Sequence, residues 1–227
     1  MTILSNRDLL KRMPVFALLT EVQMDYVSAS LIKQRFRRGS LIIQKDRKNE
    51  YLYVLINGTA QSSITNVEGH EVILSDFKAD DYFGEQCLLT NMDSECSVRA
   101  KTQSDLFLIT KDLFLNCLYN NPAFAKAVMV NFAMSLRKAN QQVENIALHS
   151  VYHRVFREVH RLASLNDGNK RTIFGKISRQ EVARRVGASR EMASRVLKDL
   201  EDRELIKTDK MENRTLLTDS FFRELHH

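Results

Sequence analysis

Residues 177–206, ISRQEVARRVGASREMASRVLKDLEDRELI, decide the fold of the C-terminal part of this chain. Ser178 is a favourable N-cap residue, and Glu181 follows three positions later, which is the sequence pattern of a capping box. Gly187 can adopt the left-handed backbone conformation that commonly ends a helix. The apolar stripe between these two signals has helical spacing and consists of Val182, Ala183 and Val186. The pattern therefore predicts a first helix between Ser178 and Gly187.

A second helix is predicted directly after that glycine. Ser189 is its expected N-cap, with Met192 as the third helical residue. The side chains expected to face inward are those of Met192, Val196, Leu197 and Leu200. The side chains expected to point outward near the N-terminal end are those of Arg190, Glu191, Ser194 and Arg195. Two short helices joined at a glycine in this way are typical of a helix-turn-helix.

The outward residues of the second helix have the chemistry that reads DNA bases. A recognition helix enters the major groove by its first turns. Arginine can donate two hydrogen bonds to guanine, and glutamate can accept one from cytosine N4. A plain pair of helices with a solvated charged face is the alternative interpretation. The segment 204–219, ELIKTDKMENRTLLTD, has strand–turn–strand character and predicts a wing, which favours double-stranded DNA as the partner.

Basic residues around this motif are expected to contact phosphates and to make binding salt-dependent. These candidates are Lys176, Arg179, Arg184, Arg185 and Lys198.

Upstream, the chain predicts a long helix that begins near Pro122. Its apolar positions alternate at spacings of three and four, as in a coiled coil. The seam consists of Met129, Phe132, Leu136, Ala139, Val143, Ile146 and Ser150. A second apolar face, expected to pack on the preceding domain, consists of Val128, Val130, Ala133, Met134 and Ala147. We expect a parallel homodimer through Phe132, Leu136, Ala139, Val143 and Ile146; a helix packed only on its own domain is the alternative.

The N-terminal half predicts short helices and then many short strands. Leu9, Leu10, Met13 and Phe16 share a face in the first thirty or so residues, and Pro14 breaks the turn. From Phe36 the hydrophobic period changes to two. The strand-like segments are LIIQK, YLYVLING, AQSSIT, EVILSDF, CSVRAK and DLFLIT. Residues 67–70 predict a hairpin tip, and the whole stretch predicts a β sandwich or barrel. Residues 151–166 predict a further helix and 171–176 a small hairpin.

Composition limits the classes of protein that fit. The chain has 227 residues, 34 Lys and Arg, and 28 Asp and Glu, which gives a net charge of +6. This excess allows a polyanionic partner. Apolar runs stay well short of the ~20 residues of a membrane span, and the N-terminus has no signal-peptide pattern. We therefore expect a cytoplasmic protein that does not enter a membrane.

Enzymatic and metal chemistry find little support in the sequence. The three cysteines, Cys87, Cys96 and Cys117, are too few and too widely spaced for a four-cysteine iron–sulfur cluster. His70 and Cys87 are weak candidates for haem ligands. His149 and His153 stand one helical turn apart, without a further zinc ligand near them in sequence. Because a nucleophile–base set and a phosphate loop are also missing from the sequence, we predict neither an enzyme nor a metal site.

The sequence resembles the cyclic-AMP receptor protein and fumarate–nitrate-reduction regulator family over nearly its whole length. The resemblance is strongest in SRQEVARRVGASREMASRVLKDLE and extends to YLYVLINGTA, DYFGEQCLL and VENIALHSV. It implies an α+β fold: an N-terminal double-stranded β-roll of the cyclic-nucleotide-binding type, a long dimerisation helix and a C-terminal winged helix-turn-helix. The expected domains are residues 1–120, 121–150 and 151–227.

The resemblance also implies functional residues. Arg190, Glu191 and Arg195 match the base-reading positions of the cyclic-AMP receptor branch, which implies an operator near TGTGA–N6–TCACA. The same resemblance implies that Ser189 and Arg179 contact the DNA backbone. RNA polymerase is an expected partner, as for a transcription activator. Gly84 and Glu85 match cassette positions that bind the ribose and phosphate of the nucleotide.

The expected effector pocket departs from that pattern. Ser94 and Glu95 stand where cyclic-AMP binders place Arg-Ser, and Ala139 and Asn140 replace the pair that contacts adenine. An anion beside a phosphate is repulsive, so cyclic AMP is disfavoured. The remaining alternatives are a regulator that needs no cofactor and one that binds cyclic di-GMP, with Glu95 on a guanine edge and Arg99, Lys101 or Arg137 on phosphate. A cyclic-nucleotide-binding signalling module that docks a protein partner is the rival to DNA binding.

Overall fold

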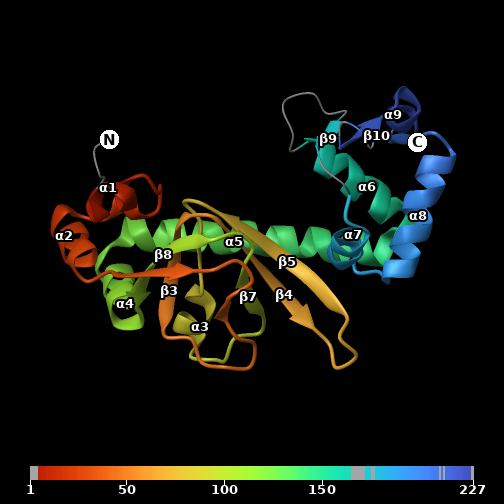
Figure 1. Ribbon diagram of the computed structural model, residues 1–227. Coiled ribbons are helices and arrows are strands. Elements are labelled where there is room, and N and C mark those ends of the chain that lie inside the picture. The colour runs from red at the N-terminus through yellow and green to blue at the C-terminus, as the bar shows by residue number, and fades with distance from the viewer. Residues whose placement is uncertain (1–4, 165–171, 175–176, 210, 212, 226–227) are drawn as a thin grey trace. The chain divides into compact units, whose positions relative to one another are not determined.

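The computed structural model describes residues 5–164, 172–174, 177–209, 211 and 213–225. It divides into two compact units. One unit comprises Met1–Ile64 and Ile73–Arg137, and the other comprises Thr65–Val72 and Lys138–His227. Figure 1 follows the chain from its N-terminal helices through the strands to the helical C-terminal part.

The first unit begins with short helical segments. They are α1 (Asn6–Lys11), the 3-10 turn η1 (Phe16–Leu18) and α2 (Glu21–Ala29), of which α1 and α2 have side-chain caps. Their apolar side chains pack with α4 (Lys111–Asn120) and the start of α5 (Pro122–Leu148) on strands of the roll. Leu10, Phe16, Phe114 and Phe124 are almost fully buried in this cluster. The predicted N-terminal helices are thereby confirmed.

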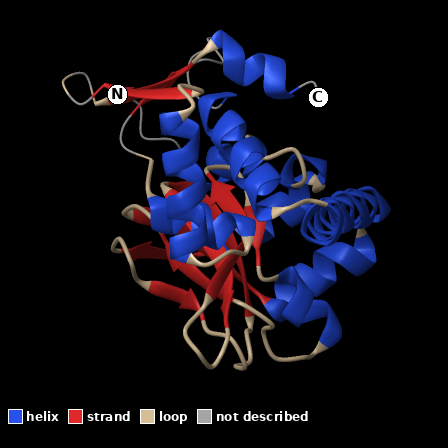
Figure 2. Cartoon of the chain, turned by 90° about the vertical axis from the view of Figure 1, so that its right-hand side faces the viewer, coloured by secondary structure: helices blue, strands red, loops and turns tan. Residues whose placement is uncertain are grey.

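Two four-stranded antiparallel sheets form the β-roll, drawn in red in Figure 2. The first has the order β1 (Ile32–Phe36), β8 (Ser104–Thr110), β3 (Tyr51–Asn57) and β6 (Tyr82–Phe83). The second has the order β2 (Leu41–Ile43), β7 (Ser97–Ala100), β4 (Thr59–Thr65) and β5 (Glu71–Lys78). Apolar side chains from both sheets share one buried cluster, so the core of the roll lies between them.

All six predicted strand segments are confirmed, as β2, β3, β4, β5, β7 and β8, whereas β1 and the two-residue strand β6 were not among them. β1 is an edge strand that pairs only with β8, and its side chains are mostly exposed. Because an edge strand of this kind lacks the alternation of apolar and polar residues, its sequence gives no period-two signal. The hairpin tip predicted at residues 67–70 is confirmed, with Gly69 N donating to Asn66 O at 3.0 Å.

The second apolar face predicted on α5 is only partly buried. Val128 is 2% exposed and packs in the first unit's core. Val130 and Met134, by contrast, are 51% and 56% exposed, and Ala133 and Ala147 are exposed too. The expectation that this whole face packs on the preceding domain was therefore wrong. On α5 this core takes up Phe124 and Val128, one helical turn apart, and Phe132 is partly buried against it.

The second unit contains the C-terminal helices and a small sheet. The helices are α6 (Val151–Ser164), α7 (Arg179–Val186), α8 (Arg190–Asp202) and α9 (Asp219–Leu225). The antiparallel sheet has the order β10 (Ile206–Asp209), β11 (Arg214–Leu217) and β9 (Thr172–Phe174). The predicted strand–turn–strand wing is confirmed as β10 and β11. The strand β9 pairs with β11, whereas the other residues of the hairpin predicted at 171–176 lie outside the described part.

The last helix, α9, was not anticipated. Phe221 is fully buried, and its ring stacks on that of Phe156 from α6, with 4.0 Å between the centroids. Arg203 extends this contact at the surface, because its guanidinium donates to both carboxylate oxygens of Glu224 at 3.0 and 2.9 Å. α9 therefore closes the core of the winged domain.

Candidate DNA interface and effector pocket

The two helices of the predicted helix-turn-helix begin at the predicted N-cap serines. Ser178 Oγ accepts a hydrogen bond from Glu181 N at 3.2 Å at the start of α7. Gly187 ends α7 in the left-handed conformation, with φ of 61°. Ser189 Oγ then accepts from Met192 N at 3.2 Å at the start of α8. These local contacts determine where α7 begins and ends and where α8 begins.

A single apolar core holds α7 and α8 together with α6 and the wing. The buried residues that the two helices contribute are Val182, Ala183, Val186, Ala193, Leu197 and Leu200. Since burying each valine or leucine side chain contributes about 1.5–3 kcal/mol, this core stabilises the packing of α8 on the domain.

The outward face of α8 carries the predicted base-reading residues. Arg190, Glu191 and Arg195 are exposed, and Ser194 is half-buried. Hydrogen bonds from the helix backbone and from Ser189, together with nearby Arg190, lower the pKa of Glu191. The carboxylate is therefore ionised at neutral pH and acts only as a hydrogen-bond acceptor. This face combines two cationic donors with one anionic acceptor.

Met192 does not face inward as predicted. It is 45% exposed, whereas its neighbour Ala193 is fully buried. The buried stripe of α8 consists of Ala193, Leu197 and Leu200, and Met192 lies one position before that stripe, about 100° around the helix. Hydrophobicity alone assigned Met192 to the core; the three- and four-residue spacing from Leu197 and Leu200 selects Ala193.

Two of the predicted phosphate-contacting arginines are held in ion pairs. Arg185 contacts Glu181 at 3.1 Å and Glu158 at 3.5 Å, and Arg184 contacts Glu181 at 3.5 Å. Their side chains are only 18% and 22% exposed. Arg179 and Lys198, by contrast, are exposed, so they remain the better candidates for phosphate contacts. Lys176 lies outside the described residues.

The cassette at Gly84 is built for close backbone approach. Gly84 has φ of 97° and precedes α3 (Glu85–Thr90). A Cβ atom there would lie 2.8 Å from Asn49 Nδ2 and 2.9 Å from the Tyr51 carbonyl oxygen. Asn49 Nδ2 donates to both the Gly84 and the Tyr51 carbonyls, at 3.1 and 2.8 Å. Only glycine fits this position without rearrangement.

Glu85 is the buried carboxylate of the cassette. Its Oε2 atom is shielded from solvent and has no hydrogen-bond partner among the described residues. Burial raises the pKa of this group. An unpartnered buried oxygen of this kind is costly, so Glu85 is suited to accept a hydrogen bond from a ligand hydroxyl.

Ser94 and Glu95, adjacent in sequence, have different environments. Ser94 is buried, and its Oγ donates to the Cys96 carbonyl at 2.8 Å. Its backbone carbonyl accepts from Asp46 N at 2.8 Å, which ties the loop to the roll. Glu95 is exposed and lines a pocket of about 370 Å³. Arg99 is exposed on β7, where Nη1 donates to the Gly39 carbonyl at 3.4 Å.

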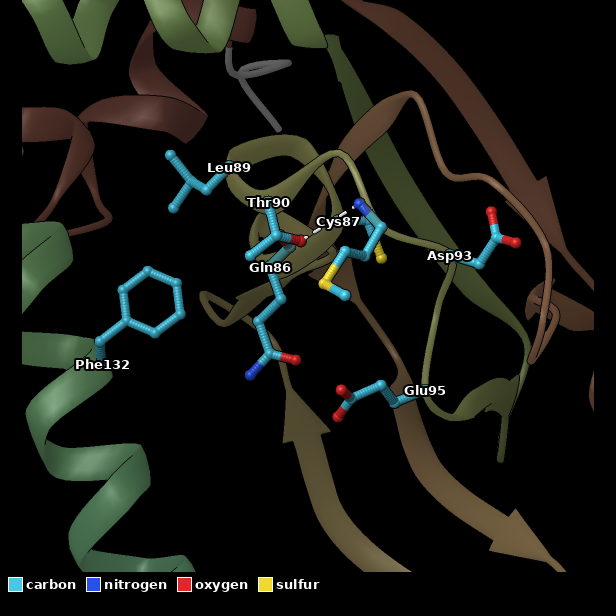
Figure 3. Close-up of a pocket in the computed structure, with 8 residues that line it drawn as sticks. Gln86, Cys87, Leu89, Thr90, Asp93, Glu95 and Phe132 are labelled. Atoms are coloured by element: carbon cyan, nitrogen blue, oxygen red, sulfur yellow. Dashed lines mark hydrogen bonds between the residues drawn. The ribbon is translucent and has the colours of Figure 1, made fainter.

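The pocket beside Glu95 is apolar and acidic (Figure 3). α3, the loop after it and α5 contribute the lining residues Gln86, Cys87, Leu89, Thr90, Met92, Asp93, Glu95 and Phe132. None of these eight residues is basic, as far as the described chain defines the pocket. Sequence reasoning missed Gln86, which directly follows the cassette glutamate, and did not connect Phe132 of α5 with this pocket. A cyclic phosphate would find no cation among these side chains.

The remaining pocket candidates lie on α5. Ala139 and Asn140 are exposed there and belong to the second unit. The predicted dimer seam is exposed along the same helix. Leu136, Val143 and Ile146 are 63%, 65% and 56% exposed, Phe132 is half-buried and Ala139 is exposed. A run of exposed apolar residues at coiled-coil spacing needs a partner surface.

Cys87 and Cys117 are buried, and Cys96 is half-buried. Burial raises the pKa of all three cysteines, and that of Cys117 to about 11. The His149 and His153 rings stack with 5.5 Å between their centroids. Within the described residues, no group of three or more His, Cys, Asp or Glu side chains could hold a metal ion. In the same residues, no helix is long and apolar enough to cross a membrane.

Comparisons with known proteins agree with this architecture. Residues 33–121 match the cyclic nucleotide-binding domain, and residues 176–206 match the crp family of bacterial regulatory proteins. The cAMP-activated global transcriptional regulator CRP of Escherichia coli O6:H1 is 32% identical over 175 residues, which cover 76% of this chain and 83% of that protein. The chain therefore belongs to the crp family and is a DNA-binding transcription regulator.

Solved structures share the fold over most of the chain. A putative regulator of the crp/fnr family from Eubacterium rectale aligns with a TM-score of 0.78 at 21% identity, and the alignment covers 94% of this chain and 97% of that one. The c-di-GMP responsive global regulator CLP of Xanthomonas campestris aligns with a TM-score of 0.76 at 25% identity, covering 87% and 99%. The predicted fold of β-roll, long helix and C-terminal helix-turn-helix is thus confirmed. The match to the crp family also favours a regulator over a module that acts only through a protein partner.

Proposed function

We propose that the protein binds a palindromic operator near TGTGA–N6–TCACA as a homodimer. The observation that carries this proposal is the exposed set Arg190, Glu191 and Arg195 on a helix that is capped by Ser189 and held by a buried core. Arginine pairs with guanine and glutamate with cytosine, and this operator offers both bases in each half-site. Arg179, Ser189 and Ser194 contact the flanking backbone or bases.

The dimer forms through α5. Leu136, Val143 and Ile146 have the spacing of a coiled-coil seam and are exposed in the single chain. Pairing them with a second copy buries this surface and sets two α8 helices about one turn of DNA apart. As a cytoplasmic activator, the dimer acts by contacting RNA polymerase.

Cyclic AMP is disfavoured as the effector. Asp93 and Glu95 line the pocket beside the cassette, and its lining residues supply no cation for a cyclic phosphate. Two alternatives remain: operator binding without an effector, and binding of cyclic di-GMP. In the second, Glu95 accepts from the N1 and amino groups of guanine, and Glu85 accepts from the ribose. Support for it comes from the likeness to CLP, which is described as c-di-GMP responsive.

The test is the selection of binding sites from random DNA by the full-length protein at moderate salt. The proposal predicts a palindrome with a guanine-containing half-site and a spacer of about six base pairs. An unrelated consensus would refute the assigned base contacts. Calorimetric titration with cyclic AMP and, separately, with cyclic di-GMP then decides between the effector alternatives.

A further inference from the structure

Met192 is an exposed apolar side chain on the part of α8 that enters the groove under the proposed function. Single exposed apolar residues are common on protein surfaces, so the exposure itself proves little. The position is more informative. Met192 belongs to the first turn of α8, and its backbone nitrogen is fixed by Ser189 Oγ at 3.2 Å.

Helical geometry places Met192 beside one of the base-reading residues. Arg195 follows three positions later, so the two side chains are separated by about 60° around the helix and about 4.5 Å along it. Both are exposed, whereas Ala193 and Leu197 are buried on another side of α8. Met192 therefore shares the outward surface with Arg195.

The charged residues of this surface do not recognise the methyl group of thymine. Arg190 and Arg195 recognise acceptors on guanine, and Glu191 recognises the cytosine amino group. Thymine differs from cytosine and from the purines by a C5-methyl group in the major groove, which proteins read by apolar contact. Among the apolar side chains on the first two turns of α8, Met192 is exposed, whereas Ala193, Val196 and Leu197 are buried or half-buried.

We propose that Met192 reads a thymine methyl group in each half-site and is a specificity-determining residue of the interface. This inference rests on the proposed function, because it requires α8 to lie in the major groove. The methionine side chain is long and flexible enough to reach a neighbouring base pair while Arg195 holds its guanine. The contact adds discrimination for thymine without a further hydrogen bond.

The test uses deoxyuridine, which pairs as thymine does but lacks the methyl group. The operator is first selected from random DNA with the wild-type protein. Each thymine is then replaced by deoxyuridine, symmetrically in both half-sites, and affinities are measured by fluorescence anisotropy. At one thymine position, loss of the methyl contact should weaken binding about threefold to fivefold per half-site. The Met192→Ala variant should bind the thymine and deoxyuridine duplexes equally at that position.

Two further variants make the result decisive. Met192→Leu keeps an apolar side chain at the same place and should retain the preference for thymine. Val22→Ala truncates an exposed apolar residue on α2 and should leave every affinity unchanged. Wild-type protein that binds its operator but shows no deoxyuridine effect at any position overturns the inference alone, as does an undiminished effect in Met192→Ala. Absence of sequence-specific binding by the wild type overturns the proposed function as well.

Discussion

Ser189 Oγ accepts a hydrogen bond of 3.2 Å from Met192 N, and this bond begins the helix that presents the proposed base-reading residues. Ser178 Oγ and Glu181 N form the same contact, also at 3.2 Å, at the start of α7. The helix-turn-helix thus contains two equivalent caps, of which one begins the proposed recognition helix. This pair makes it possible to separate the structural role of a cap from a role in DNA binding.

Replacement of either cap serine with alanine should lower the stability of the winged domain by about 1 kcal/mol. Thermal unfolding followed by circular dichroism measures this loss. Operator affinity should fall further for Ser189→Ala than for Ser178→Ala, because Ser189 is also expected to contact the DNA backbone. Equal affinities for the two variants would mean that Ser189 only caps the helix and does not contact the DNA backbone.

Replacement of Arg190 or Arg195 with alanine should cost about 1–3 kcal/mol of operator binding and relax the preference at one guanine. Competition binding against operators mutated at each position measures both effects. Lys198→Ala is the matched control on the same helix. It should weaken binding to all sequences alike and reduce the salt dependence by the contribution of about one phosphate.

Aspartate in place of Val143 or Ile146 should disrupt the dimer, because a charge would enter the apolar seam of α5. The variant should sediment as a monomer or aggregate, and it should lose operator binding, since half-site spacing depends on two linked subunits. Val22→Asp, at another exposed apolar position, should leave the dimer intact. If the Val143→Asp protein still sedimented as a dimer, the interface would have to lie elsewhere.

Glu85→Gln should become increasingly more stable than the wild type as the pH rises. Burial raises the pKa of the folded carboxyl above its ordinary value of 4.5, so the folded state holds the proton more tightly than the unfolded state. The stabilisation from this proton is fully present below 4.5 and is lost as the pH rises through the higher folded value. Glutamine keeps the shape without the ionisation. Melting temperatures of the variant and the wild type at about pH 5 and about pH 8 measure the difference. A variant that is less stable than the wild type at the higher pH would contradict the assignment.

Micromolar cyclic AMP should change operator affinity by less than about threefold, because Glu95 adds repulsion where a cyclic phosphate would need a cation. Anisotropy titrations with and without the nucleotide measure this. If calorimetry detects cyclic di-GMP binding, Glu95→Ala should abolish it and leave the melting temperature unchanged. A tenfold gain in operator affinity with cyclic AMP would contradict the prediction.

Features with a strong local cause were predictable from the sequence. The capped helices, the glycine at residue 187 and the alternating strands each follow from a few neighbouring residues. The prediction that Met192 faces inward was wrong because the more hydrophobic residue is not the buried one here. Ala193 occupies the core position, although it is less hydrophobic than Met192. β1 was missed because its mostly exposed edge sequence lacks an alternation of apolar and polar residues, and α9 was missed because its packing depends on Phe156, which is distant in the sequence.

In the candidate sites, too, some features follow from local sequence and others depend on residues distant in the chain. Exposure of Arg190, Glu191 and Arg195 follows from helical spacing. The ion pairs of Arg184 and Arg185 with Glu181 follow from helical spacing as well. The pair of Arg185 with Glu158 does not, because Glu158 comes from another helix and only the fold brings it to Arg185. Likewise, Phe132 reaches the pocket from α5, far along the chain from Gln86 and Glu95. Both contacts required the tertiary structure.

The most direct test of the account compares affinities for two duplexes that differ only in spacer length. One carries TGTGA–N6–TCACA, and the other carries the same half-sites with five additional base pairs, about half a helical turn. A dimer with one α8 helix per half-site should bind the first duplex at least about a hundredfold more tightly, because the longer spacer turns the second half-site to the opposite face of the DNA. Equal affinity for the two duplexes would contradict the account.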